Sequence, residues 1–125
     1  MNIAAWVVSG LLAAAYLMAG ILKTTRSKDA LEPNMPWVAD FSPRTVKFIG
    51  SVELLGALGL ILPWLLEIAE VLTPLAATGL ALIQLLAIPV HVRRGEAAQA
   101  LPVNIALLAA AAFVAVARFA DLCSA

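Results

Sequence analysis

Four long apolar stretches make up most of this chain, and charged residues avoid almost all of their length. Each stretch is long enough to cross a bilayer as an α-helix, which takes about 20 mostly apolar residues. The pattern therefore predicts an all-α fold, a four-transmembrane-helix bundle with a short interfacial segment between helices 1 and 2. We expect a single integral membrane domain over residues 1–125, with spans at about 3–22, 44–66, 73–92 and 100–119.

Proline and capping residues indicate where several of these helices begin and end. Ser42-Pro43 and Thr73-Pro74 each place a capping hydroxyl before a proline at the first helical position. Gly95, directly after a run of basic residues, is expected to terminate the third helix. Pro102 leaves two alternatives for the fourth helix, which either starts at this residue or continues through it with a kink.

Lysine and arginine are distributed unevenly between the two sides of the predicted bundle. The connections between helices 1 and 2 and between helices 3 and 4, with the helix ends that adjoin them, carry seven of these residues. The opposite side carries Arg118 alone. Because cytoplasmic loops of membrane proteins are enriched in Lys and Arg, we expect a multi-pass protein of the cell inner membrane or plasma membrane with both termini outside the cytoplasm.

The connection between the first two helices contains two aromatic residues four positions apart. Trp37 and Phe41 share one face if the chain forms a helical turn here. Aromatic side chains of this kind favour the headgroup region of a bilayer. We therefore expect Pro36–Phe41 to form a short interfacial segment on the cytoplasmic surface, serving either as an anchor or as a lid or docking site.

The apolar stretches themselves run over Ile3–Leu22, Phe48–Leu66, Val71–Val90 and Ala97–Ala117, and Glu53 is the single Asp, Glu, Lys, Arg or His inside them. An ionisable side chain in a span costs roughly 2.5–3.5 kcal/mol on insertion scales and normally faces a partner, a cavity or a pathway. Gly50 and Gly56 lie three residues on either side of it, and small residues let helices approach closely in lipid. We expect Glu53 to face the bundle interior, and Gly50, Gly56 and Gly59 to be helix-packing positions.

Each of the other three helices carries an uncharged hydrogen-bonding residue at a similar depth, namely Tyr16, Gln84 and Asn104. With a rise of about 1.5 Å per residue, this layer lies roughly 8–10 Å from the side predicted to be cytoplasmic. Two interpretations stay open. The layer is either interhelical glue or part of a cytoplasm-facing pocket, whose ligand-binding residues would be Glu53, His91, Lys23, Gln84, Tyr16 and Asn104.

The remaining residues exclude several classes of protein. Cys123 is the only cysteine, so an intramolecular disulfide and a CxxC redox pair are both absent. We identify no catalytic set, no metal site and no ligand set for haem, flavin or an iron–sulfur cluster, and so expect no cofactor of the chain's own. Aromatic residues are few and no basic stripe accompanies them, which argues against a nucleic-acid partner. Arg118 and Asp121, three residues apart, are expected to pair and to anchor the outer end of the fourth helix.

Several motifs spread along the chain carry a family resemblance. They are Ala19-Gly20 with Lys23, Asp40-Phe41-Ser42-Pro43, Glu53-Leu54-Leu55-Gly56, Leu72-Thr73-Pro74 and His91-Val92-Arg93-Arg94-Gly95. Together they resemble the DoxX-like family of membrane proteins over nearly the whole chain. The resemblance implies a compact four-helix membrane protein with Lys23, Glu53 and His91 as family-pattern polar positions. It implies no established reaction, although some members are associated with quinone-linked or redox membrane assemblies.

Three functions compete on this evidence. The first is a non-catalytic accessory or ligand-binding subunit, whose polar pocket takes a lipid-like or quinone-like molecule or a partner's helix. The second is a small proton-coupled transporter acting through Glu53, which the strong charge bias and the position of Glu53 on the second helix disfavour. The third is a purely structural membrane assembly factor. The expected partners are the lipid bilayer and, as candidates, a hydrophobic small molecule (a quinone or a lipid), another membrane protein or a second copy of the chain.

Overall fold

The computed structural model describes residues 3–124, so the first two residues and the last residue of the predicted domain lie outside the described residues. Two short helical segments lie between the first two long helices, α2 (Lys28–Leu31) and the 3₁₀ helix η1 (Pro36–Asp40). No strand occurs within residues 3–124. Four helices are long and apolar enough to span a membrane, which confirms the predicted all-α four-helix fold; they are α1 (Ile3–Thr25), α3 (Pro43–Leu66), α4 (Leu72–Arg93) and α5 (Ala97–Cys123).

The two capping hydroxyls predicted from the sequence behave differently. Ser42 caps α3 as expected, since its side chain accepts a hydrogen bond from the Thr45 backbone N–H at 3.2 Å. The predicted cap at Thr73 is wrong, because α4 already begins at Leu72 and has no side-chain cap. The Thr73 hydroxyl instead donates to the backbone oxygen of Gly59 at 2.8 Å. A buried hydroxyl needs a partner in lipid, and here the neighbouring helix supplies it.

The turn between α4 and α5 agrees better with what the sequence predicts. Gly95 adopts a left-handed backbone conformation with φ of 73° directly after α4 and its C-cap, and this conformation ends helices most readily at glycine. The fourth helix does not start at Pro102, because α5 begins at Ala97 and continues through this proline.

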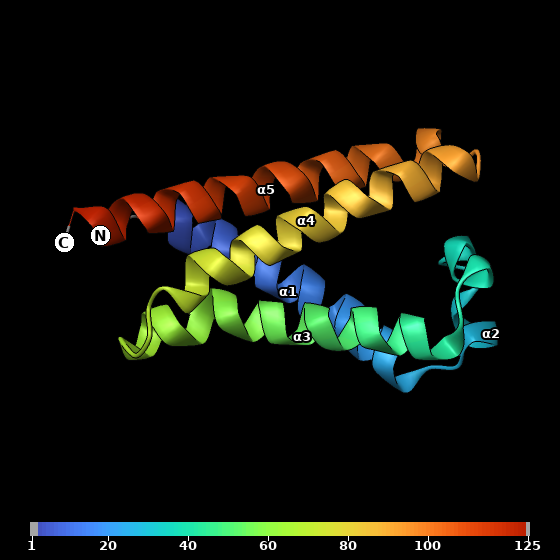
Figure 1. Cartoon of the computed structure of the whole chain (residues 1–125), viewed down its shortest axis with the longest axis horizontal. Coiled ribbons are helices and arrows are strands. Elements are labelled where there is room, and N and C mark those ends of the chain that lie inside the picture. Colours follow the sequence, from blue (N-terminus) through green and yellow to red (C-terminus); the bar gives the residue numbers. More distant parts are fainter. Residues whose placement is uncertain (1–2, 125) are drawn as a thin grey trace.

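The long helices form two hairpins, with α1 packed along α3 and α4 packed along α5. Contacts of α3 with α4 and of α1 with α5 join the hairpins into one bundle. Figure 1 shows the beginning of α1 and the end of α5 at one end of the bundle, and α2 at the other. The connection that contains α2 and η1 therefore lies at the same end as the turn between α4 and α5.

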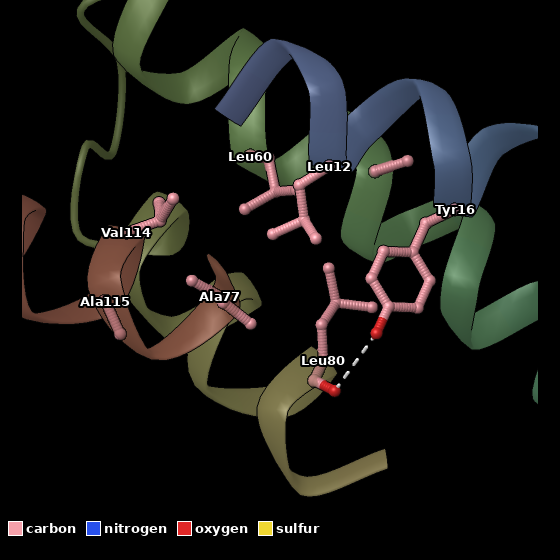
Figure 2. Close-up of a cluster of buried hydrophobic side chains, with 9 residues drawn as sticks. Leu12, Tyr16, Leu60, Ala77, Leu80, Val114 and Ala115 are labelled. Atoms are coloured by element: carbon pink, nitrogen blue, oxygen red, sulfur yellow. Dashed lines mark hydrogen bonds between the residues drawn. The ribbon is translucent and has the colours of Figure 1, made fainter. Parts of the chain in front are cut away.

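An apolar core joins the two hairpins in the half of the bundle nearer the link between α3 and α4. Glycines allow the close contact between these two helices, because a Cβ atom on Gly56 would lie 2.7 Å from Leu80 Cδ2 and one on Gly59 would lie 2.8 Å from Ala76 Cβ. The buried members of the core come from all four long helices, as Figure 2 shows; they are Leu12, Tyr16, Ala57, Leu60, Ala77, Leu80, Ala111, Val114 and Ala115.

The crossing of α1 over α3 is equally close but lies in the other half of the bundle. A Cβ atom on Gly50 would lie 2.6 Å from Lys23 Cβ and 3.1 Å from the backbone oxygen of Gly20. The two glycines therefore let the helix backbones approach, and the approach brings Lys23 of α1 against α3.

A small second cluster holds η1 near the beginning of α3. Its buried residues are Leu31, Val38 and Val46. The aromatic pair predicted from the sequence also forms, with the rings of Trp37 and Phe41 in an edge-to-face arrangement at 5.6 Å. Because η1 packs on these apolar residues, its position relative to the helices is defined rather than left to a free loop.

Candidate functional site

A cavity of about 410 Å³ lies between the two hairpins, in the half of the bundle where α2 and η1 are found. Most of its wall is apolar and includes side chains such as Ile49, Ile83 and Leu107. The structure brings all six residues of the predicted ligand-binding set to this one cavity, namely Tyr16, Lys23, Glu53, Gln84, His91 and Asn104.

An ion pair between α1 and α3 is the most polar feature of the cavity. Lys23 Nζ lies 2.7 Å from Glu53 Oε1, and Glu53 is only 2% exposed. The ammonium also lies 5.1 Å from the centre of the Trp37 ring, which adds a cation–π contact. A charge buried away from water needs such a partner, and the carboxylate of Glu53 has it in Lys23, which lies in the last turn of α1.

Next to this pair on the cavity wall, three uncharged side chains form a chain of hydrogen bonds across three helices. Asn104 Nδ2 donates to Gln84 Oε1 at 2.6 Å, and Gln84 Nε2 donates to the Tyr16 hydroxyl at 2.6 Å. The Tyr16 hydroxyl in turn donates to the backbone oxygen of Leu80 at 3.4 Å, the contact drawn in Figure 2. The chain links α5 through α4 to α1 and forms one wall of the cavity. The same bonds hold the helices in register, so these three residues both line the cavity and stabilise the packing of the helices.

The mouth of the cavity carries a second group of charges, centred on Glu96. His91 Nδ1 lies 3.0 Å from Glu96 Oε1, and Arg94 Nε donates to Glu96 Oε2 at 2.9 Å. Arg94 also reaches η1, where its Nη1 lies 2.6 Å from Asp40 Oδ2. The hydrogen bond from Arg94, with a smaller contribution from His91, holds the pKa of Glu96 below its ordinary value. The same two carboxylates, Asp40 first, raise the pKa of Arg94.

The charges at the mouth attach η1 to the far hairpin. Trp37 and Phe41 both line the cavity, while Asp40 lies between them in sequence and pairs with Arg94 at the end of α4. Sequence reasoning placed His91 at the mouth but missed Asp40, Arg94 and Glu96. The available signal was the glycine after Arg94, because a left-handed turn there folds Glu96 back toward the histidine.

A different polar centre lies at the opposite end of the bundle, around Arg118. The predicted pair with Asp121 is present, with Arg118 Nη1 3.5 Å from Asp121 Oδ2. Arg118 is nevertheless buried, with 1% exposure, rather than lying on the surface as an anchor. Its guanidinium carbon lies over two indole rings, 4.8 Å from the centre of Trp6 and 4.4 Å from the centre of Trp64. The sequence held a signal that was missed, since these three residues lie near the same ends of three predicted spans.

Within residues 3–124, no group of three or more His, Cys, Asp or Glu side chains is arranged to hold a metal ion. The polar contacts that the structure does show at the cavity are the hydrogen-bond chain through Gln84, the buried ion pair of Lys23 and Glu53, and the charges around Glu96.

Four apolar helices of membrane-spanning length, joined around a buried ion pair, define a multi-pass integral membrane protein. The chain belongs to the DoxX-like family, whose family model matches residues 7–114. No curated protein and no solved structure matches the chain.

Proposed function

We propose that this protein is a non-catalytic accessory or ligand-binding subunit, and that the cavity between its hairpins takes a lipid-like or quinone-like molecule. The observation that carries the proposal is the composition of the cavity wall, in which six polar side chains from four helices meet an otherwise apolar surface. A polar headgroup would lie near Lys23 and Glu53, and an apolar chain would lie along the remaining wall.

The size and lining of the cavity support a small molecule. Its volume of about 410 Å³ falls within the range of roughly 300–1,000 Å³ found for small-molecule sites. Such sites are mostly apolar with a few placed polar groups that orient the ligand. The cavity has the same division, with donors from Lys23 and acceptors from Glu53 beside aliphatic side chains.

The exposed part of the cavity wall indicates how a ligand would enter. Among the lining residues, the exposed ones are Ala15 of α1 and Leu86 of α4. A lateral opening, separate from the mouth near His91, would therefore lie between α1 and α4, and lipid flanks both helices there in a spanning bundle. An apolar molecule could reach the cavity from the bilayer without passing through water. The proposal includes the orientation expected from the charge bias, with the basic end and the mouth facing the cytoplasm.

Two alternatives are less well supported by these contacts. A proton-coupled transporter acting through Glu53 would have to break its 2.7 Å pair with Lys23 in each cycle. For a purely structural assembly factor, the supporting observation is the hydrogen-bond chain through Gln84, which satisfies polar groups within the bundle. A helix bundle that needed only this chain would not require a cavity beside it, because well-packed interiors leave few voids larger than a water molecule.

Native mass spectrometry of protein extracted in mild detergent tests the proposal. We expect the protein to retain a small molecule. Ala19→Phe, which places a ring on the cavity wall, should abolish retention. Ala14→Phe is the matched control, since Ala14 is exposed on the same helix and is not part of the lining. A bound protein in place of a small molecule would favour the assembly factor, and retention that survives Ala19→Phe would contradict a site in this cavity.

A further inference from the structure

The guanidinium of Arg118 is enclosed at the end of the bundle away from the cavity. Arg118 is 1% exposed, and its guanidinium carbon lies over two indole rings, 4.8 Å from the centre of Trp6 and 4.4 Å from the centre of Trp64. Two flat aromatic faces suit a planar cation. The rings attract the cation but supply no oxygen acceptor for its N–H groups, which need partners elsewhere.

Those partners are incomplete. Nη1 has a long contact of 3.5 Å with Asp121, whereas Nε and Nη2 have no hydrogen-bond partner within the described part of the chain. Nε and Nη2 are the two donors of one edge of the guanidinium, the edge that binds two oxygens of one anion side by side. Buried donors without acceptors are costly, most of all on a charged group. The structure thus leaves one complete two-donor edge unmatched.

We propose that Arg118 is an anion site, which binds two oxygens of one phosphate or carboxylate group through Nε and Nη2. Its position fits a headgroup, because Arg118 is five residues before Cys123, the last residue of α5, or about 8 Å along the helix axis. Tryptophan side chains favour the same depth. Two sources share this chemistry, the phosphate of an anionic phospholipid and a free phosphate ion.

Binding needs a local rearrangement. Both donor nitrogens are closed off from solvent by neighbouring side chains, so an anion reaches them only after one of these side chains moves. Asp121, whose side chain is 35% exposed, is the carboxylate beside the site and repels an incoming anion. Removing its charge therefore strengthens binding, which is the opposite of what its loss would do if the pair were only structural.

Tryptophan fluorescence provides the readout, because Trp6 and Trp64 contact the guanidinium. Protein in a neutral detergent is titrated with phosphatidylglycerol in one arm and with inorganic phosphate in the other. Two charge-assisted hydrogen bonds predict that Arg118→Gln weakens binding by at least about tenfold. Arg118→Lys keeps the charge but loses the two-donor edge, so it should bind more weakly than the parent.

Two further variants complete the test. Asp121→Asn should bind more tightly, and Arg93→Gln, an exposed arginine at the other end of the bundle, should bind as the parent does. An Arg118-dependent response to the lipid alone identifies a headgroup site, and one to inorganic phosphate identifies a free-anion site. Equal binding by the parent and both Arg118 variants, or weaker binding by Asp121→Asn, would overturn the proposal. Circular dichroism of each variant shows whether it is folded. If Arg118→Gln does not fold, the single variants Arg118→Lys and Asp121→Asn still test the proposal.

Discussion

The buried pair of Lys23 and Glu53 leads to a prediction about stability that separates it from a surface salt bridge. Exposed pairs contribute roughly 0–1 kcal/mol, whereas breaking a buried pair by removing one partner costs about 3–5 kcal/mol, because the other charge is left without compensation. The side chains here are 10% and 3% exposed and their charged atoms lie 2.7 Å apart. The pair therefore belongs to the buried class.

The two single substitutions should differ in size. In Glu53→Gln, Lys23 lies at the end of α1 and can extend its long side chain toward the headgroups, so we expect a loss near the lower end, about 3 kcal/mol. In Lys23→Met, the carboxylate has a short side chain and is deeper in α3, so we expect a loss of about 4–5 kcal/mol. The double variant Lys23→Met with Glu53→Met should lose far less than the sum, since neither charge is left behind.

The measurement is the free energy of unfolding in detergent micelles for the parent, both single variants and the double variant. Glu32→Gln serves as a control, because it makes the same carboxylate-to-amide change on the exposed end of α2. It should alter stability by less than about 0.5 kcal/mol. Additive single effects, or a loss below about 1 kcal/mol in Glu53→Gln, would show that water in the cavity screens the pair and would refute the reasoning.

Three further predictions concern the packing, the mouth and the turn. Gly50→Ala should lower the free energy of unfolding by about 1–3 kcal/mol, because the new Cβ would lie 2.6 Å from Lys23 Cβ. Gly79→Ala places its Cβ in open space and should raise the free energy of unfolding by up to about 1 kcal/mol. Similar thermal unfolding curves for the two variants would contradict this. Asp40→Asn should loosen the contact of η1 with α4 while the apolar cluster around Val38 still holds η1, so that a cysteine placed at Ala87 on the cavity wall, in a chain without the native cysteine, reacts up to about fivefold faster with a thiol reagent. An unchanged rate would show that the pair with Arg94 does not restrict access to the cavity. The lowered pKa of Glu96 means that its ion pair stabilises the turn above the ordinary value of 4.5 and is lost as pH falls through the lowered pKa, which an NMR titration of the carboxyl checks; a midpoint at or above 4.5 would argue against the pair.

The inward direction of Glu53 is an example of what local pattern can predict. The carboxylate shares a helix face with Gly50 and Gly56, and all three positions are on one helix, so their relation follows from helical spacing alone. In the structure Glu53 is buried on that face. The cap at Ser42 and the stop at Gly95 were also predicted, because each depends on backbone atoms within a few residues.

Thr73 shows why other local predictions were wrong. A threonine before a proline is a typical cap, yet its hydroxyl donates to Gly59 on the neighbouring helix. The competing acceptor is 14 residues away in sequence, and its distance depends on how closely α3 and α4 pack. Arg118 is a similar case, since its burial depends on Trp6 of α1 and Trp64 of α3 meeting at one place.

The sequence by itself determined that the chain forms four membrane helices, and which polar residues they carry. Both follow from the length and period of apolar runs, which are properties of each segment alone. Only the tertiary structure decided which polar groups meet: Lys23 pairs with Glu53, Asp40 pairs with Arg94, and Arg118 contacts two indole rings while two of its three guanidinium nitrogens have no hydrogen-bond partner in the described part of the chain. In lipid a polar side chain must find its partner on another helix, so the pairing depends on crossing and rotation of the helices rather than on spacing along one of them.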